Sequence, residues 1–109
     1  MATTTYKVLA QSAPSATSNT DIYTVGAGKQ TVISTLIIAN RSTAASFRIA
    51  IRPDAATLAN THYIAYDVPV GANDSTTLTL GLTLDASDVV TVYASSANLT
   101  FSIFGAEIA

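Results

Sequence analysis

The sequence predicts an all-β protein, a single antiparallel sandwich of about eight short strands with a jelly-roll or related Greek-key arrangement. Two observations lead to this prediction. Hydrophobic and polar residues alternate with a period of two in several segments, whereas helical periodicity is almost absent. Clusters of Gly, Pro, Asn, Asp and Ser separate these segments at short intervals. The chain of 109 residues has the size of one domain with one hydrophobic core, so we treat residues 1–109 as a single unit.

Alternation is clearest in three segments, and each indicates a strand with one buried face. Residues 47–52 place Phe and Ile on one side and two arginines on the other. Residues 77–84 place four leucines on one side, and residues 99–103 alternate in the same way. The number of strands favours a jelly roll and leaves an immunoglobulin-like strand order open. We expect strands near residues 5–10, 20–25, 30–40, 46–52, 62–68, 75–84, 89–94 and 98–106.

The connections are short, and most contain residues that favour turns. Residues 26–29 predict a turn between two strands, and residues 69–74 predict another. Residues 54–60 contain two alanines but are too short for a stable helix, so we expect a single turn or an extended loop. The first 20 residues are rich in Thr and Ser, and we consider an arm that orders only against a neighbouring subunit.

The composition excludes several classes of function. Charged residues make up 11% of the chain, against about 25% in typical domains, and the net charge is −2. The five basic residues form no stripe, so we expect no nucleic-acid binding. No apolar run approaches the ~20 residues that span a membrane, and the first residues lack the pattern of a signal peptide. We therefore expect a protein that is made in the cytoplasm and stays off the membrane.

No group of residues suggests catalysis, a metal site or a cofactor. His62 is the only histidine, and the odd spacing to Asp67 places the two on opposite faces of a strand. Asp85 and Asp88 are too sparse for a dedicated calcium loop, and they fit a turn. The chain has no cysteine, which excludes thiolate chemistry and cysteine-based zinc sites. We expect a protein that is not an enzyme and that binds no cofactor or metal.

Four side chains are candidates for contacts between subunits: Tyr63, Tyr66, Arg48 and Arg52. Tyrosine supplies contact area and one hydrogen bond, which suits both interfaces and the rim of a sandwich core. The two arginines alternate outward on one strand, where they would pair with carboxylates of a partner or be solvated. Uncharged strands such as residues 75–83 suit a surface that another protein covers, because hydroxyl groups cost less to desolvate than charges.

Three stretches carry a resemblance to a known group of proteins. The first runs from Tyr6 to Val25: a strand, a connector rich in Pro, Ser, Ala and Thr, and a second strand that ends Ile22-Tyr23-Thr24-Val25. The second is residues 35–40 followed by the alternating residues 47–51, and the third is the closing segment, residues 99–107. Together these stretches resemble small virion structural proteins of tailed bacteriophages, in particular those of cyanobacterial and marine phages.

The resemblance implies a non-enzymatic virion component that is assembled in the host cytoplasm. Our first expectation is a capsid decoration or cement protein that binds the major capsid protein and stabilises the shell. A component of the tail, neck or fibres is the second, and a carbohydrate-binding module for host attachment is the third. In each case we expect a symmetric homo-oligomer, with a trimer favoured.

Overall fold

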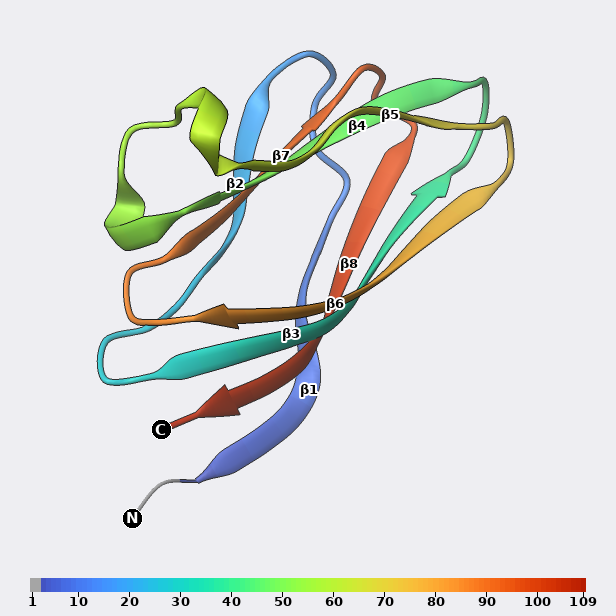
Figure 1. Cartoon of the computed structure of the whole chain (residues 1–109). Coiled ribbons are helices and arrows are strands. Elements are labelled where there is room, and N and C mark those ends of the chain that lie inside the picture. Colours follow the sequence, from blue (N-terminus) through green and yellow to red (C-terminus); the bar gives the residue numbers. More distant parts are fainter. Residues whose placement is uncertain (1–2) are drawn as a thin grey trace.

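The computed structural model describes residues 3–109 and is an all-β sandwich (Figure 1). All eight predicted strands are present, and each observed end lies within two residues of the predicted one. Within residues 3–109 there is no α-helix, only two 3₁₀ turns, η1 (Pro53–Ala55) and η2 (Asn60–His62). The strands are β1 (Thr4–Ser12), β2 (Asn19–Thr24), β3 (Gln30–Asn40), β4 (Ala45–Arg52), β5 (Tyr63–Val70), β6 (Ser75–Leu84), β7 (Val89–Ala94) and β8 (Leu99–Ile108).

The strand order is that of a jelly roll. The chain folds back on itself between β4 and β5, so that β4 pairs with β5, β3 with β6, β2 with β7 and β1 with β8, all antiparallel. The pairs then join into two four-stranded sheets, β1-β8-β3-β6 and β2-β7-β4-β5. This nested pairing settles the choice that the sequence left open, because an immunoglobulin-like domain orders its strands differently.

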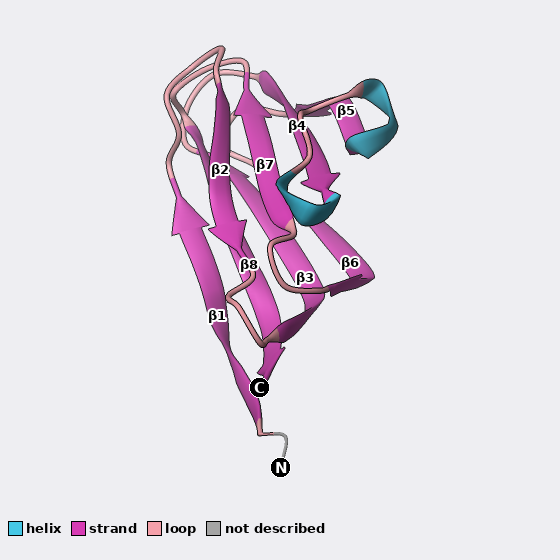
Figure 2. Ribbon diagram, turned by 90° about the vertical axis from the view of Figure 1, so that its left-hand side faces the viewer, coloured by secondary structure: helices cyan, strands magenta, loops and turns pink. Residues whose placement is uncertain are grey.

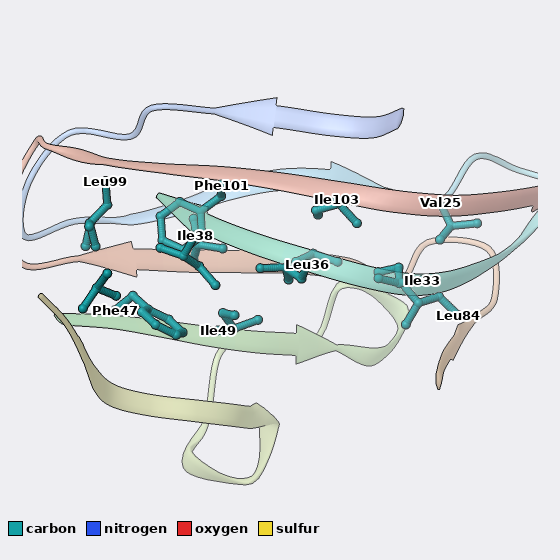
Figure 3. Packing of buried hydrophobic residues seen from close by; sticks show 14 residues of the cluster. Val25, Ile33, Leu36, Ile38, Phe47, Ile49, Leu84, Leu99, Phe101 and Ile103 are labelled. Carbon is teal, nitrogen blue, oxygen red and sulfur yellow. The ribbon is translucent and has the colours of Figure 1, made fainter. Parts of the chain in front are cut away.

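The hydrophobic core lies between the two sheets (Figure 3). Phe101 on β8 meets Phe47 on β4 edge to face, with ring centroids 6.2 Å apart, and this pair links the two sheets. The alternating residues predicted to point inward on β8 are all fully buried. The fully buried residues with the largest side chains are Phe47, Phe101, Ile33, Leu36, Ile38, Ile49, Leu99 and Ile103.

A bulge on β3 interrupts the regular alternation of inward and outward side chains. On β3 the inward residues are Ile33, Leu36 and Ile38, a spacing of three and then two. The break occurs at Ser34, which has no partner on β8, because Ile33 pairs with Gly105 while Thr35 pairs with the next residue along β8. An extra residue in one strand increases its bend and twist, which helps the sheet to wrap around the core.

Two expectations for the connections need correction. Residues 4–12 form β1, which pairs with β8 along its length, so this part of the chain is a strand of the sandwich and not a free arm. Residues 1–2 of the expected arm lie outside the described residues. Pro69 lies inside β5 rather than in the following turn, opposite Ser46. A proline is tolerated there because β5 is an edge strand, where one side of the backbone has no strand to bond.

The segment between β4 and β5 packs beside the β2-β7-β4-β5 sheet (Figure 2). It is an extended loop with a 3₁₀ turn at each end, where the sequence predicted a single turn or an extended loop and no stable helix. Ala50 and Thr91 are buried although they alternate with inward residues, because this loop and the side chains near it cover that part of the sheet. The two ends of the described chain also meet: the Thr3 and Ala109 backbones exchange two hydrogen bonds, 2.7 and 2.9 Å long.

Candidate interaction surfaces

The four predicted contact residues lie on or next to the outer face of the β2-β7-β4-β5 sheet. Arg48 is stacked between two tyrosine rings, with its guanidinium carbon 4.2 Å from the Tyr66 ring centroid and 4.3 Å from that of Tyr93. Tyr63 meets Tyr66 edge to face, with centroids 4.9 Å apart. We call Arg48, Tyr63, Tyr66 and Tyr93 the aromatic cluster.

The aromatic cluster exists because β5 is irregular. Tyr63 and Tyr66 are three residues apart, a spacing that places two side chains on opposite faces of a regular strand. The register of β5 against β4 shifts twice, and Asp67 has a φ of +52°. These bulges turn the two rings toward each other on one side of the sheet. Tyr66 is 55% exposed, so it offers the most surface in the cluster.

Both arginines form ion pairs with carboxylates within the chain. The Arg48 Nε donates a hydrogen bond of 2.6 Å to Asp67 on β5, and this bond raises the pKa of the guanidinium. Arg52 donates to an Asp21 oxygen at 2.8 Å and to the Thr91 hydroxyl at 3.0 Å. It also donates to the Ala56 carbonyl, so it ties the β4–β5 loop to the sheet. Contact between these arginines and another subunit stays a prediction.

A cluster of four polar side chains lies between the sheets near the chain ends. The Tyr23 hydroxyl on β2 donates to Glu107 on β8 at 2.6 Å and lies 2.8 Å from the Thr31 hydroxyl on β3. Lys7 on β1 forms an ion pair of 2.7 Å with the other Glu107 oxygen. Burial and the bond to Glu107 raise the pKa of Tyr23 to about 12, while bonds from Lys7 and Tyr23 lower the pKa of Glu107. Four strands are thus linked by polar side chains whose role is structural.

The residues considered for chemistry serve the fold. The His62 Nδ1 accepts the Ala59 N–H at 3.1 Å, which stabilises the turn η2. Asp88 accepts the N–H groups of Asp85 and Asp54, each at 2.8 Å, and so joins the β6–β7 turn to η1. Between residues 3 and 109, no group of three or more His, Asp or Glu side chains is placed to hold a metal ion. No helix in this range is long and apolar enough to cross a membrane.

The outer face of the β1-β8-β3-β6 sheet carries no Asp, Glu, Lys, Arg or His side chain. Because paired residues share a face of a sheet, the register gives its members directly. We call this surface the uncharged face. It consists of threonine, serine and glutamine together with apolar residues. Its members on β1 and β8 are Thr4, Tyr6, Val8, Gln11, Thr100, Ser102, Phe104, Ala106 and Ile108. Its members on β3 and β6 are Gln30, Val32, Thr35, Ile37, Ala39, Ser75, Thr77, Thr79, Gly81 and Thr83.

Two of the large apolar residues that are exposed between residues 3 and 109 lie on this face. Tyr6 is 84% exposed and Val8 is 49% exposed, and they pair with Ala106 and Phe104 across β1 and β8. The sequence analysis named neither as a contact residue, although both lie within the first 20 residues that it considered as an arm against a neighbouring subunit. Hollows border this face toward opposite ends of β8, one beside Gln11 and Ser102 and one beside Ile108, and Asp85 and Asp88 also line the second. The face itself combines apolar groups and hydroxyls without charge.

Comparison with known proteins adds no assignment: no protein-family model and no curated protein sequence matches the chain.

Proposed function

We propose that the protein is a non-enzymatic structural component of a tailed-bacteriophage virion, a decoration protein that binds the outside of the capsid and stabilises it. The observation that carries the proposal is the uncharged face, a whole sheet surface without an acidic or basic side chain. The sequence resemblance to small virion proteins supports the same function. The major capsid protein is the proposed partner, and the assembled virion is the proposed location.

The dimensions of the uncharged face suit a stable protein contact. Four strands at ~4.8 Å spacing and ten residues at ~3.4 Å rise give a surface of roughly 19 by 34 Å, or about 650 Å². Covering it buries about 1,300 Å² when both partners are counted, which lies in the range of specific interfaces. No charge has to be desolvated, and Tyr6 and Val8 add apolar contact near one edge.

A charge placed in the centre of the face tests the proposal. Thr35 lies on the central strand β3 and points outward, so Thr35→Lys puts an unpaired ammonium group into the proposed contact. Asn19→Lys, an exposed position on β2 of the opposite sheet, is the matched control. Shells that lack the protein are mixed with each variant, and bound protein and heat-induced DNA release are measured.

We expect the natural chain and Asn19→Lys to bind the shells and to raise the temperature of DNA release. Thr35→Lys should bind at least about tenfold more weakly, because its ammonium group would be buried without a partner. Equal binding by all three proteins would exclude the uncharged face as the docking surface. An electron-microscopy map that places the protein in the tail, neck or fibres would show that the proposed location on the capsid is wrong.

Carbohydrate binding by Tyr63 and Tyr66 has weaker support. A sugar ring usually stacks on an exposed aromatic face, whereas Arg48 already covers one face of Tyr66 and the Tyr63 ring meets it edge on. Tyr66 therefore holds the arginine, and the two rings do not form an open platform.

A further inference from the structure

The four edge strands of the sandwich differ in how well they are protected against pairing with another strand. Exposed edges invite such pairing, and proteins block it with charges, proline, bulges or short length. β2 is six residues long, contains Asp21 and has a bulge. β5 contains Asp67 and Pro69 and has two register shifts. β1 contains Lys7 and a bulge next to Leu9. Three edges thus carry recognisable protection.

The fourth edge, β6, has almost none. Its ten residues include no charged residue and no proline. One register shift against β3 occurs near Gly81, yet exposed and half-buried side chains alternate without a break from Ser75 to Thr83. β3 pairs with one side of β6, and no other strand of the described chain pairs with its outer side. The backbone groups on that side are therefore free to bond another strand.

We propose that β6 pairs antiparallel with β6 of a second copy of this chain, so that two sandwiches join across a two-fold axis into one eight-stranded sheet. The strand is complementary to itself. Paired residues of antiparallel strands lie on the same face, so threonines meet threonines, Ser75 or Gly81 outside, and leucines meet leucines or Thr76 inside. The same rule prevents Asp74 from lying directly opposite Asp85 of the second copy. Directly paired residues of this strand are both even-numbered or both odd-numbered, whereas 74 is even and 85 is odd.

A second copy would also bury leucine side chains of β6 that are only partly buried in a single chain. Leu78, Leu80 and Leu82 are only partly buried and pack at the margin of the core, because β6 has a neighbour on one side only. The leucines of the partner strand would cover this margin. The two uncharged faces would become continuous, with a width of roughly 38 Å for eight strands at ~4.8 Å spacing. The pairing is two-fold, in contrast to the trimer favoured from the sequence.

Single cysteines test the pairing directly, because the natural chain has no cysteine. Thr77→Cys, Thr79→Cys, Gly81→Cys and Thr83→Cys form a scan along the outward side of β6, and a Cβ at Gly81 meets no atom within 4 Å. Thr35→Cys on β3 is the control. Paired strands bring opposite Cα atoms within the ~4.4–6.8 Å that a disulfide requires only next to the two-fold axis.

We therefore expect disulfide-linked dimers to peak at one scanned position and to fall on both sides of it. If the axis passes through a leucine, the peak should appear in a mixture of two neighbouring variants. The proposal would be overturned if every single variant along β6 and every mixture of two neighbouring variants gave the same yield as Thr35→Cys.

A charge at the edge provides the second test. Thr79→Lys should raise the dissociation constant of the dimer about tenfold or more, because lysine on an edge strand opposes strand pairing. Thr35→Lys lies one strand away and should leave the dimer intact. Analytical ultracentrifugation measures both, with circular dichroism as a check of folding.

A monomeric or trimeric natural chain would overturn the pairing, and dissociation by both variants would indicate packing through the faces instead. These measurements use the purified protein alone. Their failure is therefore distinct from a failure of shell binding.

Discussion

Gly105 occupies a position where the backbones of β8 and β3 approach too closely for any side chain. A Cβ added there would overlap the Val32 carbonyl oxygen and would lie 3.0 Å from its carbonyl carbon and 3.1 Å from the Ile33 Cα. All three atoms belong to the backbone, so no side chain can rotate away to relieve the overlap. The approach follows from the bulge at Ser34, which shifts the register of β3 against β8 beside this glycine.

Gly105→Ala therefore forces β8 and β3 apart in the middle of a sheet. Overlap of this kind costs about 3 kcal/mol of the free energy of unfolding. With ~2.1 cal/mol/K of unfolding entropy per residue, a chain of 109 residues loses about 4 °C of melting temperature for each 1 kcal/mol. Gly105→Ala should thus lower the melting temperature by about 13 °C.

Gly81→Ala is the matched control, because a Cβ at Gly81 meets nothing within 4 Å. It should leave stability unchanged or raise it by about 0.5 kcal/mol, since alanine reduces the freedom of the unfolded chain. Thermal and denaturant unfolding, followed by circular dichroism, measure both variants. Melting temperatures that agree within about 2 °C would refute the close approach of β8 and β3, because an effect of ~3 kcal/mol would then be missing.

Two further predictions concern polar side chains that bond inside the sandwich. Tyr23 has a pKa raised to about 12, so its contribution to stability is complete below its ordinary value of 10.0 and is lost as the pH rises through 12. Denaturant unfolding from pH 8 to 12 should show a smaller alkaline loss in Tyr23→Phe than in the natural chain, and equal losses would contradict this linkage. The Asn40 side chain is buried and donates to the Thr43, Val70 and Gly71 carbonyls. Asn40→Ala should cost about 2 kcal/mol in thermal unfolding, while the exposed Asn60→Ala should cost less than about 0.5 kcal/mol; similar costs would show that these bonds contribute little.

Strand positions were predictable because the local pattern and the tertiary fold agree along most of the chain. Residues 99–103 alternate in sequence and alternate between buried and partly exposed in the structure. The same holds for β6, where the leucines point inward as expected. A strand with one buried face must alternate, so its sequence carries this information by itself.

The contact residues were predictable only in part. Tyr63 and Tyr66 lie on one strand as expected, but their ring contact depends on bulges that leave no mark in the alternation. The pairing of Arg48 with Asp67 and of Arg52 with Asp21 depends on which strands are neighbours. A charge pattern in one strand cannot reveal a partner that lies 19 or 31 residues away.

The sequence alone determined the sandwich, its eight strands and the shortage of charge, because each of these follows from local pattern and composition. Only the tertiary structure decided the jelly-roll order, the unprotected edge at β6 and the uncharged face. That face draws on β1, β3, β6 and β8, which the chain reaches at widely separated points. Pairing distant strands places their uncharged sides next to one another, and no single segment records that arrangement.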